Sequence, residues 1–348
     1  SEGNGFIGSL SNFALGGITK ESIFGDNLPT FAFVAFQMMF ALITPAIITG
    51  SVAGRMKFKA LFVFIGLWSI LVYYPLAHMV WGGGFIGVTL KALDFAGGDV
   101  VHISSGLTGL ILAIILGKRN GYSQVNYRIH NIPFVVLGMA LLWFGWFGFN
   151  AGSALAANGL AAHAFMTTAI SAAAAMLVWM LIDIFKQGKP TLIGACTGVI
   201  AGLVGITPAA GFVSIGASLL IGITVAPVCY FGIILIKRIL KIDDALDAFG
   251  CHGIGGIWGG ILTGLFVTPE LNLTEGLGGL FYGGGLTQLI SQIEGILITI
   301  AVVAVGTLIA LGITKIFFPL RASKHEEANG LDMSEHGEIA YPSFNGLD

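Results

Sequence analysis

Charged side chains are scarce in this sequence. Only 10% of its 348 residues are Asp, Glu, Lys or Arg, whereas an ordinary soluble domain has about 25%. Hydrophobic residues make up 55%, and the mean hydropathy is +0.90. A chain of this length with so little charge is too apolar for an ordinary soluble domain. The net charge of −2 gives no support for nucleic-acid binding.

Cysteine is also scarce. The three cysteines, Cys196, Cys229 and Cys251, each lie in an apolar stretch and lack the spacing of metal ligands. We therefore predict three buried free thiols rather than a disulfide or a metal site. The sequence predicts no metal and no other cofactor.

Glycine, in contrast, is abundant. There are 52 glycines in 348 residues, about twice the average share. Many lie inside apolar stretches, as in residues 250–264. Small residues let transmembrane helices approach closely, because packing replaces the hydrophobic drive between helices in lipid. This distribution favours a closely packed helix bundle in a membrane.

Nine apolar segments have a length and composition that predict membrane spans. A span needs about 20 mainly apolar residues. The segments are 30–52, 60–81, 97–117, 131–152, 160–185, 191–207, 213–236, 248–267 and 291–314. We predict an all-α polytopic membrane protein with an outer segment (1–29), a transmembrane domain (30–320) and a cytoplasmic tail (321–348).

The basic residues predict the orientation. All of the 16 Lys and Arg residues except Lys20 and Lys91 fall in alternate connections between the predicted spans. Short cytoplasmic loops are enriched in Lys and Arg. We therefore predict a protein of the cell membrane (inner or plasma membrane) with its N-terminus on the outer side and its C-terminus in the cytoplasm. The alternation is regular only if all nine segments span. Asn272, in a predicted outer loop, begins a weak glycosylation motif.

Two histidines, His102 and His252, are predicted to lie at membrane depth. Ionisable side chains there are costly and indicate function. Asp94 precedes His102 by eight residues, and Asp247 precedes His252 by five. The pattern predicts two helices that enter from opposite faces, as in inverted-topology repeats. Two facing neutral imidazoles would share a proton and offer lone pairs to a small polar solute; the alternative is two separate histidines, each bonded to a carbonyl.

The other polar residues have two interpretations. Asp94 and Asp247 are suitable N-caps of helices, or Asp94 is a buried carboxylate that shapes the electric field of an outer vestibule. The remaining histidines are predicted to be interfacial or solvated. They are His78, His130, His163, His325 and His336.

Aromatic residues predict an entrance. Trp81 precedes three glycines, which leave its ring face open to attract a cation. Phe36 and Phe40 lie four residues apart on one helix face, as do Phe149 and Ser153. An aromatic pair beside a hydroxyl group fits an outer gate. The alternative is packing against lipid or at the membrane interface.

Several long stretches resemble the ammonium transporter family (Amt proteins and methylammonium permeases, related to Rh proteins). They are AHMVWGGG (77–84), LDFAGGDVVHISSG (93–106), GWFGFNAGSA (145–154), GKPTLIGACTGVIAGLVGITPAAG (188–211), DAFGCHGIGGIWGGILTG (247–264) and, in the tail, GLDMSEHGEIAY (330–341). The likeness runs from about residue 30 to 341.

The resemblance implies site residues by position. Those implied for ammonium recruitment are Trp81, Phe40 and Ser153, with Phe36, Gln37 and Asp94 at the entrance. Phe36 or Phe40 is implied to stack on Phe149 as a gate. The implied pore residues are the paired His102 and His252, with Trp146, Thr197 and Thr207 around them.

The resemblance also implies an assembly and a mechanism. Ammonium would be recruited by the aromatic site and deprotonated, and ammonia would cross the twin-histidine pore. It implies a homotrimer with one pore per subunit and a cytoplasmic PII-type partner. Family members usually have eleven spans, so the first two are predicted to be missing here. The first half of a five-plus-five inverted repeat would then hold three helices.

Other functions are less consistent with the sequence. The main alternative is an Rh-like or other neutral-solute channel for gas or water. The sequence lacks the Asn-Pro-Ala pair of an aquaporin, and Trp81 with Ser153 argues against an Rh-like gas pore. An intramembrane enzyme is disfavoured because no nucleophile or metal-ligand triad accompanies the histidines. A sensor is disfavoured because the tail leaves no room for a signalling domain.

Overall fold

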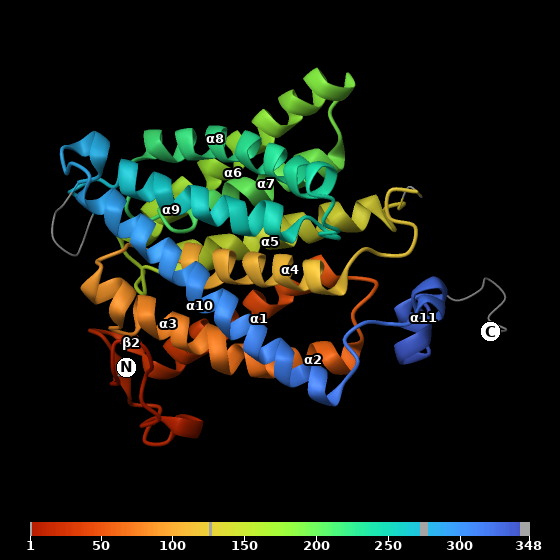
Figure 1. Cartoon of the computed structure of the whole chain (residues 1–348). Helices are drawn as coiled ribbons and strands as arrows, with labels where there is room; N and C mark the ends of the chain where they lie inside the picture. Colours follow the sequence, from red (N-terminus) through yellow and green to blue (C-terminus); the bar gives the residue numbers. More distant parts are fainter. Residues whose placement is uncertain (1, 125–126, 272–277, 342–348) are drawn as a thin grey trace.

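The computed structural model is a bundle of long helices, and it describes residues 2–124, 127–271 and 278–341. Eight helical segments within these ranges are long and apolar enough to cross a membrane. The N-terminal segment and the C-terminal tail lie at opposite ends of the bundle (Figure 1). The chain is therefore an all-α, multi-pass membrane protein, as predicted.

The helices follow the predicted segments. The first half contains α1 (Thr30–Val52), α2 (Phe58–Trp68), η2 (Ser69–Tyr73), α3 (Tyr74–Trp81), η3 (Phe85–Thr89), η4 (Gly98–Ile103) and α4 (Ser104–Leu116). The second half contains α5 (Ile132–Gly152), α6 (Gly159–Gln187), α7 (Leu192–Ile206), α8 (Ile215–Ile234), η5 (Leu235–Ile239), η6 (Phe249–Gly253), α9 (Ile254–Phe266) and α10 (Thr287–Phe317).

Smaller elements lie at the ends of the bundle. A short antiparallel pair, β1 (Ile23–Phe24) and β2 (Leu28–Pro29), follows η1 (Phe13–Leu15) in the N-terminal segment. The tail carries α11 (Lys324–Asn329) and η8 (Asp332–His336), and η7 (Leu280–Tyr282) precedes α10. Asn272 and its glycosylation motif lie outside the described residues.

Two predicted spans differ in length from the structure. The second predicted segment, 60–81, is part of a longer helical stretch, Phe58–Thr89. The sixth, 191–207, is the helix α7, whose 15 residues are fewer than a straight span needs. Most residues of α7 are buried among its neighbours, so the helix lies inside the bundle and needs little contact with lipid.

Polar side chains cap four helices of the second half, α5 to α8, at their N-termini. A side-chain oxygen of the residue before each helix accepts a hydrogen bond from a backbone N–H of the first turn, which satisfies an otherwise unpaired donor. The capping residues are Asn131 (α5), Asn158 (α6), Thr191 (α7) and Ser214 (α8). Gly188 ends α6 in the left-handed conformation, with φ of 84°.

Glycines allow the closest helix crossings. A Cβ atom on Gly106 of α4 would overlap the backbone nitrogen of Gly253 in η6. A Cβ atom on Gly202 of α7 would lie 2.5 Å from the carbonyl oxygen of Ser171 in α6. These contacts require glycine and fix how the helices cross. The three cysteines are buried and free, as predicted.

Candidate functional site

A cavity of about 610 Å³ lies at one end of the bundle and is lined by α1, α3 and the segments that precede η4 and follow α5. Six residues predicted for the outer site line it together. They are Phe36, Gln37, Phe40, Trp81, Asp94 and Ser153. We refer to this space as the vestibule.

The polar atoms of the vestibule are oriented by local hydrogen bonds. Trp81 Nε1 donates to the carbonyl oxygen of Asp94 at 2.8 Å, which holds the indole ring in place. Ser153 Oγ donates to the carbonyl oxygen of Phe149 at 2.9 Å. Because that bond uses the hydroxyl proton, the lone pairs of Ser153 remain available to accept from a ligand.

A column of aromatic rings leads inward from the vestibule. Phe40 is 2% exposed and meets Trp81 edge-on, with ring centroids 5.6 Å apart. The centroid of Phe40 also lies 4.5 Å from that of Phe149, whereas Phe36 packs on Phe40 at 4.8 Å. Of the two phenylalanines predicted to stack on Phe149, Phe40 is therefore the one whose ring contacts it.

The two histidines meet behind this pair of rings. The Nδ1 atoms of His102 and His252 are 3.2 Å apart, so one imidazole donates and the other accepts. His102 is fully buried and stacks on Phe149 at 6.0 Å and 10°. Its Nε2 has no hydrogen-bond partner within the described residues. This geometry fits a shared proton better than two separate histidine–carbonyl bonds.

Further residues surround the histidine pair. Trp146 stacks on His102 at 5.4 Å, and its Nε1 donates to Thr207 Oγ1 at 2.9 Å. A second cavity of about 1000 Å³ lies between α1 and α5 and reaches His102 and His252. Thr197 lines this second cavity and donates to the carbonyl oxygen of Ile193 at 2.8 Å. The histidines therefore lie between the vestibule side and a larger apolar space.

Asp94 caps the helical segment that carries His102. Its carboxylate accepts hydrogen bonds from the backbone N–H groups of four residues at 2.6–3.4 Å, namely Gly97, Gly98, Asp99 and Val100. Asp94 is 7% exposed and also lines the vestibule. The two interpretations of this aspartate, a cap and a vestibule carboxylate, are thus compatible.

The second cap was predicted wrongly. Asp244, not Asp247, accepts from the backbone N–H groups of Ala248 and Phe249, at 3.2 and 2.9 Å. Asp247 has a positive φ of 60° and pairs with Lys237 at 2.8 Å. Asp247 is thus paired with a lysine and accepts no backbone N–H bond within the described residues.

A repeat in the sequence would have identified Asp244. The pattern Leu-Lys-x-x-Asp, with a His eight residues after the Asp, begins at Leu90 and again at Leu240. The two histidines are 150 residues apart, and the two lysines, Lys91 and Lys241, have φ of 57° and 56°. Both copies lead into a π-helical turn, η4 or η6. The inverted repeat is therefore visible in backbone geometry as well as in sequence.

One further prediction fails at His78, which is 8% exposed and lies 2.7 Å (Nε2) from the carbonyl oxygen of Asn4. It is buried under the N-terminal segment rather than interfacial or solvated.

His163 is partly buried, and its Nε2 lies 2.8 Å from the carbonyl oxygen of Val213. Within the described residues, no group of His, Cys, Asp or Glu could hold a metal ion.

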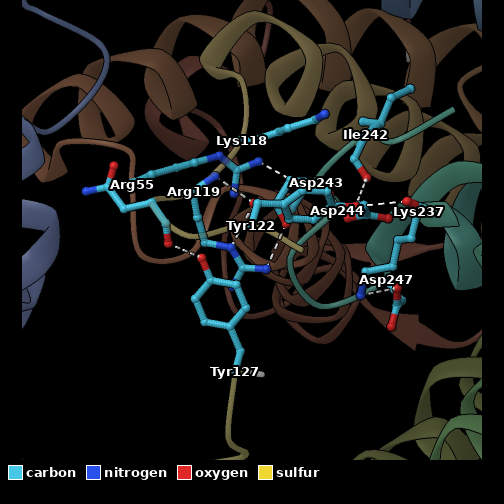
Figure 2. A network of polar contacts seen from close by, with 12 residues as sticks. Arg55, Lys118, Arg119, Tyr122, Tyr127, Lys237, Ile242, Asp243, Asp244 and Asp247 are labelled. Carbon is cyan, nitrogen blue, oxygen red and sulfur yellow. Dashed lines mark hydrogen bonds and ion pairs between the residues drawn. The ribbon is translucent and has the colours of Figure 1, made fainter. Parts of the chain in front are cut away.

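Sequence reasoning missed an ion-pair network, which Figure 2 shows from close by. It lies at the end of the bundle where α1 and α4 finish. Asp243 accepts from Arg119 through the backbone N, Nε and Nη2 at 2.8, 2.9 and 2.7 Å, and its carbonyl oxygen accepts from Arg55. Burial alone would raise the pKa of Asp243, but the hydrogen bonds and charge of Arg119 outweigh it and lower this pKa. No local sequence pattern pairs residues so far apart.

The tail is joined to the same end of the bundle. Lys57 pairs with Glu326 at 2.8 Å, and Arg321 donates to the carbonyl oxygen of Leu116 at 2.7 Å and to Glu327 at 2.9 Å. The hydrogen bond from Lys57 lowers the pKa of Glu326 to about 2. These contacts hold the start of the tail against the connections that follow α1 and α4.

Comparisons with known proteins agree with this architecture. The sequence model of the Ammonium Transporter Family matches residues 1–341. An ammonium transporter of Bacillus subtilis (strain 168) is 51% identical over 340 residues, which are 97% of this chain and 83% of that protein. An ammonium transporter of Aquifex aeolicus (strain VF5) is 48% identical over 97% of this chain and 78% of its own length.

Solved structures are similar as well. The crystal structure of Candida albicans Mep2 superposes with a TM-score of 0.85 at 36% identity, over 93% of this chain and 73% of that one. The structure of Saccharomyces cerevisiae Mep2 gives 0.82 at 40% identity, with the same coverage. The prediction that two spans are missing from the first half stays a prediction. The extent of the family match and the identity to these relatives show that this chain belongs to the Ammonium Transporter Family.

Proposed function

We propose that this protein transports ammonium across the membrane, recruiting it in the vestibule and conducting ammonia past the histidine pair. The observation that carries the proposal is the continuous file of rings from Trp81 through Phe40 and Phe149 to His102 and His252. Successive ring centroids are 5.6, 4.5, 6.0 and 5.2 Å apart. A solute that follows this file meets a cation-attracting entrance first and a buried imidazole pair last.

The vestibule suits a small cation that donates hydrogen bonds. The indole face of Trp81 attracts a desolvated cation by about 0.5–2 kcal/mol. The lone pairs of Ser153 accept a hydrogen bond, which ammonium can donate and a bare alkali ion cannot. The carboxylate of Asp94 adds negative charge to the wall of the same cavity. A neutral-gas channel has no use for these features.

The inner part suits neutral ammonia. Phe40 and Phe149 exclude bulk water, and the apolar surroundings disfavour a charged species. Ammonium therefore gives up a proton to water on the vestibule side of the ring pair, and ammonia passes on. The Nε2 of His102, which has no hydrogen-bond partner within the described residues, is a buried polar atom that ammonia meets as it passes Phe149. The complementary tautomers of the imidazole pair keep one donor and one acceptor available at this depth.

Uptake of methylammonium into transporter-deficient cells tests this function. Trp81→Ala removes the cation–π contact and should raise the apparent KM about 2- to 30-fold, and His102→Ala should alter the maximal rate. Trp179→Phe and His163→Ala are matched controls, because Trp179 packs on Tyr230 and His163 on Val213, both away from the ring file. Wild-type uptake by both test variants would rule out these site assignments.

The assembly and topology belong to the same proposal. We propose a homotrimer in the cell (inner or plasma) membrane, with residues 1–29 outside, 30–320 in the membrane, the tail (321–348) in the cytoplasm and a PII-type protein as partner. In the most apolar 18-residue stretch of α5, only 6% of the residues are buried inside a single chain. This helix is therefore free to contact lipid or a neighbouring subunit. Native mass spectrometry in detergent would contradict the trimer if only monomers were released.

A further inference from the structure

Asp99 is a second buried carboxyl group in the segment η4, and the ring file does not use it. It is 5% exposed, and its Oδ1 has no hydrogen-bond partner within the described residues. The other carboxyl oxygen, Oδ2, points toward α10, where a Cβ atom on Gly295 would lie 3.7 Å from it. The side chain therefore faces the interior of the bundle between η4 and α10.

A hydroxyl group from α10 faces the same point. Thr299 is fully buried, and its side chain interacts with the carboxyl group of Asp99. Thr299 Oγ1 also lacks a hydrogen-bond partner of normal geometry. Buried polar atoms are almost always paired, so the carboxyl group of Asp99 and the hydroxyl group of Thr299 are suited to pair with each other across the two helices.

The surrounding charges favour a proton over a metal ion. The carboxyl group of Asp94 interacts electrostatically with that of Asp99, and two carboxylates this close repel each other. The residues described around Asp99 include no Lys or Arg paired with it, and His102 lies three residues further along the same segment. On α10 the adjacent polar residues are Gln292 and Thr299, while Glu294 is exposed. An unpaired carboxylate at this depth would be strongly disfavoured.

We propose that Asp99 and Thr299 form a buried proton-binding site, in which the carboxyl group carries a proton and donates it to Thr299 Oγ1. Asp94 differs from Asp99 in this respect, because its four backbone N–H donors suit a carboxylate. One negative charge, that of Asp94, then remains at the outer end of η4. Asp94, which lines the vestibule, accepts a hydrogen bond from the backbone N–H of Asp99 at 2.9 Å, so the proposed site adjoins the vestibule wall. This site does not depend on the proposed transport of ammonium.

Infrared spectroscopy of the full chain in lipid tests the site without measuring transport. The wild type at pH 7 should show a C=O stretching band of a protonated carboxylic acid that shifts in D2O. Asp99→Asn, which matches the shape of the neutral acid, should lose that band. Thr299→Val removes the acceptor and should move the band to higher frequency. Size-exclusion elution identifies the folded samples that are compared.

The outcomes separate the possibilities. A wild-type spectrum without the band would overturn the proposal, and so would an Asp99→Asn spectrum that retains it. A band whose intensity falls when sodium or potassium chloride is added would also overturn it, because a metal ion and not a proton would then occupy the site. If Asp99→Asn does not fold, the expected shift in Thr299→Val decides, and an unshifted band there counts against the proposal.

Discussion

The pair Arg119–Asp243 provides a sensitive test of the inner network. Arg119 makes three hydrogen bonds to the carboxylate of Asp243, whose side chain is 0% exposed. The substitution Arg119→Met removes the two bonds from the guanidinium group and leaves a buried charge. Removing one partner of a buried pair typically costs about 3–5 kcal/mol. Because Arg55 remains close to Asp243, we expect a loss near the lower end, about 3 kcal/mol.

The pH dependence follows from the pKa of Asp243. In the wild type this pKa lies below its usual value, so the pair contributes its full stability above about pH 4 and loses it as the pH falls through the lowered pKa. In Arg119→Met the effect of burial is opposed by the remaining backbone N–H of residue 119 and by the charge of Arg55, so the carboxyl group takes up a proton at higher pH than in the wild type. The difference in the free energy of unfolding between the wild type and the variant should be largest near neutral pH and should shrink as the pH falls.

The assay is the free energy of unfolding of the purified protein, measured by denaturant titration in micelles at several pH values. Arg128→Met is the matched control, because Arg128 is exposed. The double variant Arg119→Met/Asp243→Asn should recover part of the loss, since the buried carboxylate charge is gone while Arg55 keeps its hydrogen bond to the carbonyl oxygen of residue 243. A loss for Arg119→Met below about 0.5 kcal/mol, typical of a surface pair, would refute this reasoning.

Two further predictions concern packing and the tail. Gly106→Ala should destabilise the fold by at least about 1–3 kcal/mol, because the added methyl group overlaps the backbone of Gly253. The control is Gly216→Ala, at an exposed glycine with open space around it. It should have little effect on the free energy of unfolding in the same titration. The depressed pKa of Glu326 means that its pairing with Lys57 stabilises tail docking above about pH 4.5 and weakens as the pH falls toward 2. A spin label on the tail should become more mobile over that range, and Lys57→Ala should release it already at pH 7; an immobile label in Lys57→Ala would contradict this.

Much of the fold could be predicted from the sequence because hydropathy is a local property. A stretch of about 20 apolar residues requires no knowledge of its neighbours, so all nine apolar segments correspond to helices. The family motifs were equally readable, since they are continuous. The length of α7 was less predictable, because a helix enclosed by protein does not need to match the thickness of the bilayer.

The candidate site was predicted in part. Its residues were named from motifs, and the structure brings the vestibule residues and the histidines into one file. The cap of η6 was misplaced, because spacing from His252 alone does not distinguish Asp244 from Asp247. The repeat beginning at Leu90 and Leu240 distinguishes them, since equivalent backbone turns place equivalent caps.

The sequence by itself determined that the chain is a helical membrane protein, which segments are apolar and which motifs it carries. Only the tertiary structure decided that Phe40 closes on Phe149, that the two histidines meet through Nδ1, and that Asp99 faces Thr299 across 200 residues of sequence. The reason is physical. Helix formation depends on neighbouring residues, whereas the rotation and crossing of helices depend on close contacts such as that of Gly106 with Gly253, which are made between distant parts of the chain.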